Sequence, residues 1–125
     1  MNDLTVLIIE DDINTRSTLR MMLGEIGITQ IFESKNGVDA MQYIDTAIST
    51  IDMIICDWNM PHKTGLDVLK EIRTIDRDIP FLMVTARADK DSVMDAREAN
   101  VSGYIRKPFT MRELETKLKT ILNNV

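Results

Sequence analysis

The chain has few of the residues that build disulfide-rich, flexible or membrane-spanning proteins. Its one cysteine, Cys56, has no partner for an internal disulfide. Three prolines and five glycines in 125 residues indicate no long linker. No apolar run reaches the roughly 18 residues that suggest a membrane helix, and the N-terminus lacks the basic segment of a signal peptide. We therefore expect a cytoplasmic protein with no membrane span, in which Cys56 is a buried apolar residue.

An excess of positive charge is also missing. Twenty acidic residues outnumber fifteen Lys and Arg, so the net charge is −5. Because nucleic-acid phosphates bind clustered Lys and Arg, this balance argues against a nucleic-acid partner. The hydrophobic fraction of 44% is ordinary for a globular protein, and the length suits one core. We expect a single domain over residues 1–125.

Five short apolar runs recur along the chain. The runs at residues 5–9, 52–56 and 80–84 are almost wholly apolar, which is typical of parallel strands covered on both faces. The runs at 30–34 and 103–106 are more polar, as edge strands tend to be. Asp52, at the start of the third run, is expected to be only a turn residue.

The stretches between these runs have the spacing of amphipathic helices. Helices are predicted at 14–27, 36–48, 64–75, 89–100 and 110–125, with Gly27 ending the first and Thr110 capping the last. The predicted apolar faces comprise Thr18, Met21, Met22 and Ile26; Val38, Met41, Ile44 and Ile48; Leu66, Leu69, Ile72 and Ile75; Val93 and Met94; and Met111, Leu114, Leu118, Ile121 and Leu122. Most methionines are expected to fill gaps in the core. Five βα repeats predict an α/β fold, with right-handed crossovers and helices on both faces of a parallel sheet.

Chemically useful side chains follow four of the five strands. Glu10, Asp11 and Asp12 follow the first, Asp57 the third, Thr85 the fourth, and Lys107 the fifth. Ligands of open parallel sheets bind outside the carboxyl ends of the strands. If these strands are neighbours, their end groups share one rim.

Such a rim would suit phosphoryl transfer. Clustered carboxylates repel unless a cation lies between them, and all-oxygen ligands favour Mg²⁺ or Ca²⁺. A lysine and a hydroxyl beside the metal would stabilise an anion, and a carboxylate oxygen would be the nucleophile. Each residue also has an ordinary alternative as a turn, cap or surface residue, but all four strand ends carrying suitable groups favours a site. His62, the only histidine, is expected to lie in a surface loop, and Trp58 to border the site.

These residues form a recognisable pattern. "VLIIEDD" followed by Arg16, "DWNMP" followed by Gly65 and Leu69, "MVTARA" and "GYIRKPF" span the chain in this order. The chain resembles the receiver domain of two-component response regulators, most of all the stand-alone, CheY-like receivers. The resemblance implies a flavodoxin-like (βα)5 three-layer sandwich with the parallel strand order 2-1-3-4-5, in which residues 1–125 form one receiver domain without an output domain.

The resemblance also implies a role for each matching residue. Asp57 would accept the phosphoryl group, Thr85 would hydrogen-bond it and Lys107 would pair with it. Glu10, Asp11, Asp57 and the backbone carbonyl of Asn59 would hold Mg²⁺, Asp11 directly and Glu10 through water; the spacing to Arg16 places the acidic pair at Glu10 and Asp11. Tyr104 would be the aromatic switch that turns inward on activation, and the Lys107–Pro108 bond would be cis.

The function implied is phospho-acceptance in a two-component system or phosphorelay, by a signalling protein rather than an enzyme. A histidine kinase or phosphotransfer protein would supply the phosphoryl group. The surface formed by the fourth helix, fifth strand and fifth helix would then bind a separate output protein, of the chemotaxis type or another. We expect a monomer or a weak, phosphorylation-dependent dimer.

Three alternatives stay open at this point. An aspartyl phosphatase like the haloacid dehalogenase group is less suited, because such enzymes carry Asp-x-Asp where this chain has Asn59. An FMN-binding flavodoxin is possible by fold, but the acidic loop after the first strand would repel the flavin phosphate. The third alternative is a receiver cut from a larger regulator, which the Met1 start and compact end disfavour.

Two positions depart from the family pattern. Glu10 stands where chemotaxis-type members usually have Asp, which weakens a specific chemotaxis assignment. Arg87, two residues beyond Thr85, is basic where an acid often lies. Because that position borders the path of attacking water, we expect an altered lifetime of the acyl phosphate.

Overall fold

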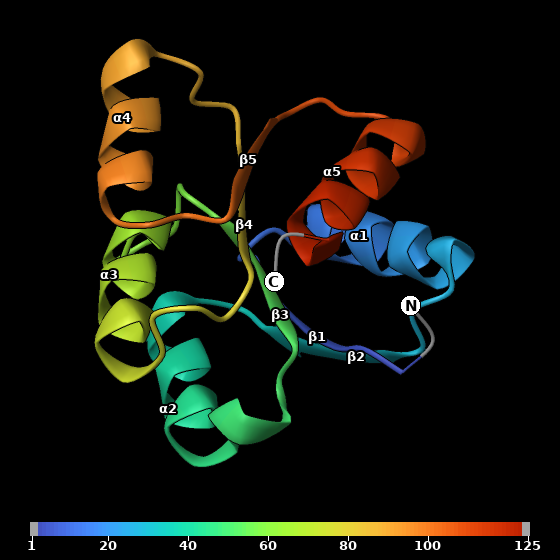
Figure 1. Cartoon of the computed structure of the whole chain (residues 1–125), viewed down its shortest axis with the longest axis horizontal. Helices are drawn as coiled ribbons and strands as arrows, with labels where there is room; N and C mark the ends of the chain where they lie inside the picture. Colours follow the sequence, from blue (N-terminus) through green and yellow to red (C-terminus); the bar gives the residue numbers. More distant parts are fainter. Residues whose placement is uncertain (1–2, 124–125) are drawn as a thin grey trace.

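Strands and helices alternate along the chain in a computed structural model that describes residues 3–123 (Figure 1). The strands are β1 (Thr5–Ile9), β2 (Gln30–Ser34), β3 (Met53–Asp57), β4 (Phe81–Thr85) and β5 (Gly103–Arg106). The helices are α1 (Ile13–Ile26), α2 (Gly37–Ala47), α3 (Gly65–Ile75), α4 (Lys90–Glu98) and α5 (Met111–Asn123), with the short 3-10 helix η1 (Ile48–Thr50) after α2. The predicted order of elements is confirmed; the last two residues of the predicted fifth helix, 124–125, lie outside the described residues.

The strands form one parallel sheet in the order β2-β1-β3-β4-β5. Figure 1 shows α1 and α5 on one side of the sheet and α2, α3 and α4 on the other. The predicted flavodoxin-like three-layer sandwich is therefore confirmed. The two more polar runs are the edge strands β2 and β5, also as predicted.

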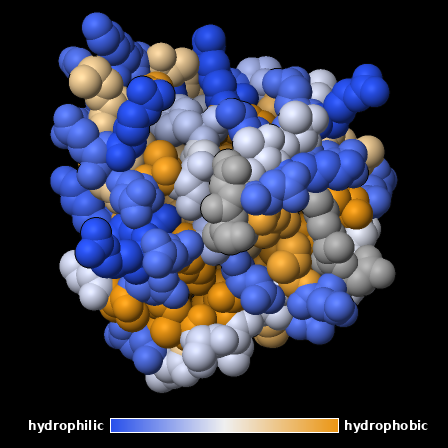
Figure 2. Space-filling view, in the orientation of Figure 1, coloured by the Kyte–Doolittle hydropathy of each residue, from blue (hydrophilic) through white to orange (hydrophobic). Residues whose placement is uncertain are grey.

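Two apolar cores lie on opposite faces of the sheet because strand side chains alternate in direction. In β1, Leu7 and Ile9 join the core beneath α2 and α3, whereas Val6 and Ile8 join the core beneath α1 and α5. Cys56 is buried in the first of these cores, as expected. Figure 2 shows hydrophobic residues mainly between the helical layers and hydrophilic residues over the outward faces of the helices.

The boundaries of β3 and β4 differ from the prediction by one residue at each end. They begin at Met53 and Phe81 and extend to Asp57 and Thr85, because these last residues still pair with the neighbouring strands. Asp52 is not only a turn residue: its backbone N–H donates to the Thr5 carbonyl, and its carboxylate accepts the Thr5 N–H, both at 2.8 Å. The aspartate thus secures the start of β1.

Several predicted helix faces were wrong in part. In α1 the buried side chains are Leu19 and Leu23, one turn apart, whereas Met21 is 58% exposed. Four other residues of the predicted apolar faces are also exposed: Val38, Ile75 and Met111 near helix ends, and Met94 in the middle of α4. In α4 the fully buried residues are the small Ser92 and Ala96. Met41, Met53, Met60 and Met83 are buried and Met22 packs against the core, so most of the described methionines fill the core, as expected.

The predicted helix caps are confirmed. Gly27 ends α1 with φ 113°, a left-handed conformation that favours glycine. Thr110 begins α5, and its hydroxyl accepts the Glu113 N–H at 3.1 Å. The Lys107–Pro108 peptide bond is cis, as expected. Within residues 3–123, no helix has both the length and the hydrophobicity needed to cross a membrane.

Candidate functional site

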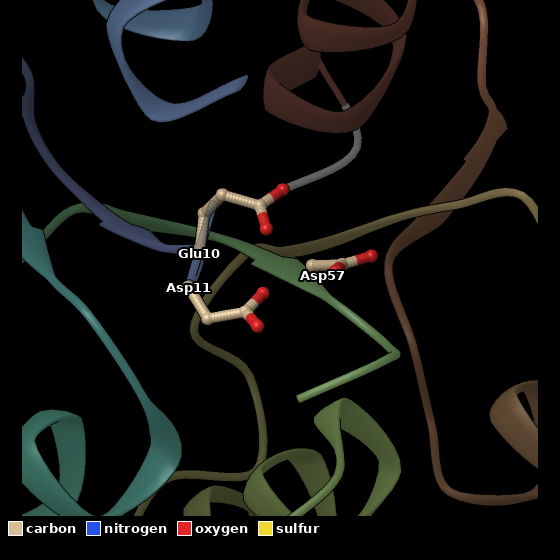
Figure 3. Close-up of side chains that lie close together, drawn as sticks. All are labelled: Glu10, Asp11 and Asp57. Carbon is tan, nitrogen blue, oxygen red and sulfur yellow. The ribbon is translucent and has the colours of Figure 1, made fainter. Parts of the chain in front are cut away.

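The carboxyl ends of β1 and β3 bring three acidic side chains together. Glu10 and Asp11 follow β1, and Asp57 ends the adjacent β3. Each offers a carboxylate oxygen, and these oxygens lie within 4.8 Å of one another (Figure 3). Glu10 and Asp57 are buried, at 1% and 6% exposure, whereas Asp11 is exposed to solvent. The cluster is thus buried on the side of Glu10 and Asp57 and open to solvent at Asp11.

Asp12 has a different role from its two acidic neighbours. Its carboxylate accepts the Thr15 N–H at 2.9 Å and so caps α1. These hydrogen bonds hold the pKa of Asp12 below its usual value. The structure therefore brings Glu10 and Asp11, rather than Asp11 and Asp12, together with Asp57.

Lys107 reaches the cluster from the end of β5. Its Nζ lies 3.0 Å from Glu10 Oε1 and 3.3 Å from Asp57 Oδ1. Burial lowers the pKa of Lys107, but the hydrogen bond with Glu10 and the Asp57 charge outweigh this effect, so its pKa lies above the usual value. The lysine is thus held as a cation between two carboxylates that come from two other strands.

Burial of Glu10 makes its ionised form less favourable. Burial raises its pKa to about 7; the hydrogen bond from Lys107 opposes the rise and the Asp57 charge adds to it. A cation beside the cluster would favour the ionised form of Glu10. Three carboxylates form an all-oxygen donor set, which Mg²⁺ prefers over nitrogen and sulfur ligands. The residues present therefore fit a divalent magnesium ion.

Thr85 and Arg87 lie at and just beyond the carboxyl end of β4, the strand that pairs with β3. Thr85 is fully buried at the end of β4, and its hydroxyl accepts the Arg87 N–H at 3.1 Å. The Arg87 side chain crosses to the loop after β3, where Nε donates to Asn59 Oδ1 at 3.0 Å. Its guanidinium also lies 5.5 Å from the centre of the Trp58 ring. Trp58, expected to border the site, is buried beneath this contact.

The sequence did not predict this link between Arg87 and Asn59. Only the backbone carbonyl of Asn59 and the charge of Arg87 were expected to matter. The two residues are 28 positions apart, and no local pattern predicts that their side chains meet across two loops. The one available signal was that both follow strands expected to be neighbours.

Tyr104 lies next to the same loop. Its hydroxyl donates to the Arg87 carbonyl at 2.6 Å, and its ring meets Trp58 edge-on at 6.5 Å between centres. His62 is exposed in the loop after β3, as expected, and has a positive φ of 69°. Of the predicted site residues, Glu10, Asp11, Asp57 and Lys107 therefore meet directly, whereas Thr85, Asn59 and Tyr104 are joined through Arg87.

Comparison with known proteins agrees with this geometry. The profile of the response regulator receiver domain matches residues 6–119. The chain is 35% identical over 122 residues to the chemotaxis protein CheY of Pseudomonas aeruginosa, which covers 96% of this chain and 97% of that protein. The solved structure of CheY4 from Vibrio cholerae has a TM-score of 0.86 at 26% identity, covering 94% of this chain and 98% of that one. A CheX–CheY–BeF3–Mg²⁺ complex from Borrelia burgdorferi matches with a TM-score of 0.91, covering 95% of this chain and 89% of that one, but at 22% identity it shows the fold alone.

The parallel sheet is covered on both faces and carries an acidic rim with a facing lysine. The family and the relatives that match this chain are CheY-like signalling modules rather than classic enzymes. The family model that matches residues 6–119 describes one group of signalling modules, the receiver domains of response regulators. The chain belongs to the response regulator receiver domain family and acts in two-component signalling.

Proposed function

We propose that Asp57 is the phosphoryl acceptor of this receiver. The observation that carries the proposal is the position of Asp57 at the end of a central strand, with Lys107 Nζ at 3.3 Å and two further carboxylates in the same cluster. An Asp57 carboxylate oxygen attacks phosphorus and forms an O–P bond. The bond to the donor breaks in line, and its electron pair leaves with the donor.

The magnesium site is the second part of the proposal. Glu10, Asp11, Asp57 and the Asn59 backbone carbonyl would hold the ion, which when bound supplies charge neutralisation for the phosphoryl oxygens. Lys107 adds a fixed positive charge beside Glu10 and Asp57. The Thr85 hydroxyl gives up its contact with the Arg87 N–H and donates to the new phosphoryl group.

Phosphorylation then changes the surface formed by α4, β5 and α5. The shift of Thr85 alters the β4–α4 loop, to which the Tyr104 hydroxyl is bonded through the Arg87 carbonyl. Tyr104 therefore senses the state of the site, and the α4-β5-α5 surface binds a separate output protein. A chemotaxis-type output is favoured by the names of the relatives, although Glu10 departs from the residue usual in that group.

The phosphodonor is a histidine kinase or a phosphotransfer protein, and the site of action is the cytoplasm. Receiver family membership supports the donor class. The lone, fully buried thiol of Cys56 suits a reducing compartment.

The decisive experiment compares Asp57→Asn with the wild type in acetyl phosphate and Mg²⁺, using intact mass. Wild type is expected to gain one phosphoryl group and Asp57→Asn none. Asp12→Asn is the matched control, because Asp12 caps α1 outside the cluster and Asn also caps helices well. A phosphoryl group on Asp57→Asn would contradict the proposal.

A further inference from the structure

The turn that carries Glu10 and Asp11 is tied to the edge strand β2 at two points. The Glu10 N–H donates to the Ser34 carbonyl at 3.1 Å, directly after the last β1–β2 pair. The Glu10 carbonyl accepts a hydrogen bond from Arg16 Nη1 at 2.9 Å. Both backbone groups of Glu10 are therefore held by partners outside the acidic cluster.

Arg16 is itself oriented by a carboxylate on β2. Arg16 Nε donates to Glu33 Oε1 at 2.8 Å, and the Arg16 side chain is only 17% exposed. The other oxygen, Glu33 Oε2, accepts from Arg20 Nε, and Arg20 Nη2 donates to the Ile31 carbonyl at 2.9 Å. Burial raises the pKa of Glu33, but the two arginines outweigh it and hold the pKa below its usual value. Glu33 thus stays charged and aims the Arg16 guanidinium at Glu10.

Holding the Glu10 carbonyl fixes the direction of the next residue. The peptide unit between Glu10 and Asp11 is planar, so anchoring its oxygen also sets the path of the chain into Asp11. The Asp11 side chain is exposed, and its place beside Glu10 and Asp57 depends on this backbone. Arg16 makes its hydrogen bonds to the Glu10 carbonyl and to Glu33, so it holds the backbone from which two of the three carboxylates extend.

We propose that Arg16, oriented by Glu33, is a positioning residue for the Mg²⁺ site. This inference rests on the proposed magnesium site and adds a requirement to it: the edge strand β2, which contributes no ligand, sets the ligand geometry. Groups that orient metal ligands commonly change metal affinity by about 10-fold to 100-fold when removed.

Because Arg16 is positively charged, an effect of its charge on Mg²⁺ binding can be told apart from an effect of positioning. A guanidinium next to a cation site repels the cation, so its removal should by charge alone tighten Mg²⁺ binding. Loss of positioning predicts the opposite direction. Arg20 is the matched control, because it also binds Glu33 and a β2 carbonyl but does not contact Glu10.

The experiment titrates MgCl₂ into unphosphorylated wild type, Arg16→Met, Arg16→Lys, Glu33→Gln, Arg20→Met and Arg20→Lys. Isothermal calorimetry and the fluorescence of Trp58, the only tryptophan, report the dissociation constant, and thermal unfolding confirms the fold. Arg16→Met is expected to weaken Mg²⁺ binding about tenfold. Arg16→Lys, which keeps the charge but not the two-sided contact, should weaken it by several-fold, and Arg20 variants should match the wild type.

Two outcomes overturn the proposal: Mg²⁺ binding to the Arg16 variants as tight as or tighter than in the wild type, or equal weakening in the Arg16 and Arg20 variants. If Arg16→Met does not fold, Arg16→Lys and Glu33→Gln carry the comparison. Failure of the proposed function would look different, since wild type would then gain no phosphoryl group on Asp57 whatever the ranking of Mg²⁺ affinities. Absence of Mg²⁺ binding by the wild type would remove both.

Discussion

At the scale of single residues, the turn after Asp57 leaves no room for a side chain at Gly65. The Gly65 N–H donates to the Trp58 carbonyl at 2.9 Å, which draws the start of α3 against the end of β3. A Cβ at this position would lie 2.2 Å from the Asp57 carbonyl oxygen. The requirement for glycine here is steric, and it is imposed by the backbone of the proposed acceptor.

Gly65→Ala should therefore destabilise the protein by about 2–3 kcal/mol, because the β3–α3 turn must shift to admit the methyl group. Gly24→Ala is the matched control: Gly24 lies in α1, and a Cβ there would meet nothing within 4 Å. That control should gain about 0.5–1 kcal/mol from helix propensity. Urea unfolding measures both, and equal midpoints for Gly65→Ala and the wild type would refute the steric argument.

Arg87 is the second residue whose role the contacts define. Its bond to Asn59 and its contact with Trp58 join the loop after β4 to the loop after β3. Arg87→Glu removes both contacts and opens the path for water, so the acyl phosphate should hydrolyse faster, by about threefold to tenfold for a change near 1 kcal/mol in the barrier.

The measurement is loss of phosphoryl group from pre-phosphorylated protein, followed by intact mass after removal of the donor. Arg97→Glu makes the same change of charge at the far end of α4 and should leave the rate unchanged. Equal lifetimes for Arg87→Glu and the wild type would remove the idea that Arg87 protects the phosphoryl group.

At the scale of elements, α4 differs from the other helices in how little it buries. Its fully buried residues are Ser92 and Ala96, whereas α3 buries Val68, Leu69 and Ile72. The end of α4 is nevertheless secured, because Arg73 of α3 donates to the Asn100 carbonyl at 2.9 Å and to the Ile79 carbonyl at 2.8 Å. The helix is thus weakly packed along its length but anchored just beyond its C-terminal end.

Amide hydrogen exchange should reflect this difference between helices. Amides of α4 should exchange faster than those of α3, because fewer buried contacts oppose local opening. Mass spectrometry of peptides from both helices in unphosphorylated protein provides the measurement. Equal protection of the two helices would argue against α4 as the mobile part of the output surface.

At the scale of the whole molecule, one sheet separates two apolar cores and gathers its polar end groups at one edge. Two strands that contribute to both cores end in residues of the site: Asp57 is the last residue of β3, and Thr85 is the last residue of β4. The cores hold the strand ends in register, and the clustered carboxylates repel one another against that packing. Stability and function therefore oppose each other at this edge.

Binding of Mg²⁺ should offset the repulsion between the carboxylates and stabilise the folded protein. Saturation at about 100 times the dissociation constant would stabilise the wild type by about 2.7 kcal/mol. Asp11→Asn removes one repelling charge and one ligand, so it should be more stable than wild type without Mg²⁺ and gain less from it. Thermal unfolding with and without MgCl₂ measures the stability of both proteins and the gain of each from Mg²⁺. Asp52→Asn, which keeps its side chain far from the cluster at the start of β1, should gain from Mg²⁺ as much as the wild type does; an Asp11→Asn protein that gains equally would contradict the site.

The local pattern of the sequence determined the strands, the helices, the caps at Gly27 and Thr110, and the residues at the strand ends. These features depend on hydrophobic periodicity and on hydrogen bonds between near neighbours in the chain. Only the tertiary structure decided which of those residues meet. Lys107 reaches Glu10 across 97 positions, Arg87 reaches Asn59 across 28, and Asp52 binds Thr5 across 47. The sequence also did not determine that Met21 is exposed or that Arg16 pairs with Glu33. The periodicity of a helix does not say which neighbouring element the helix packs against.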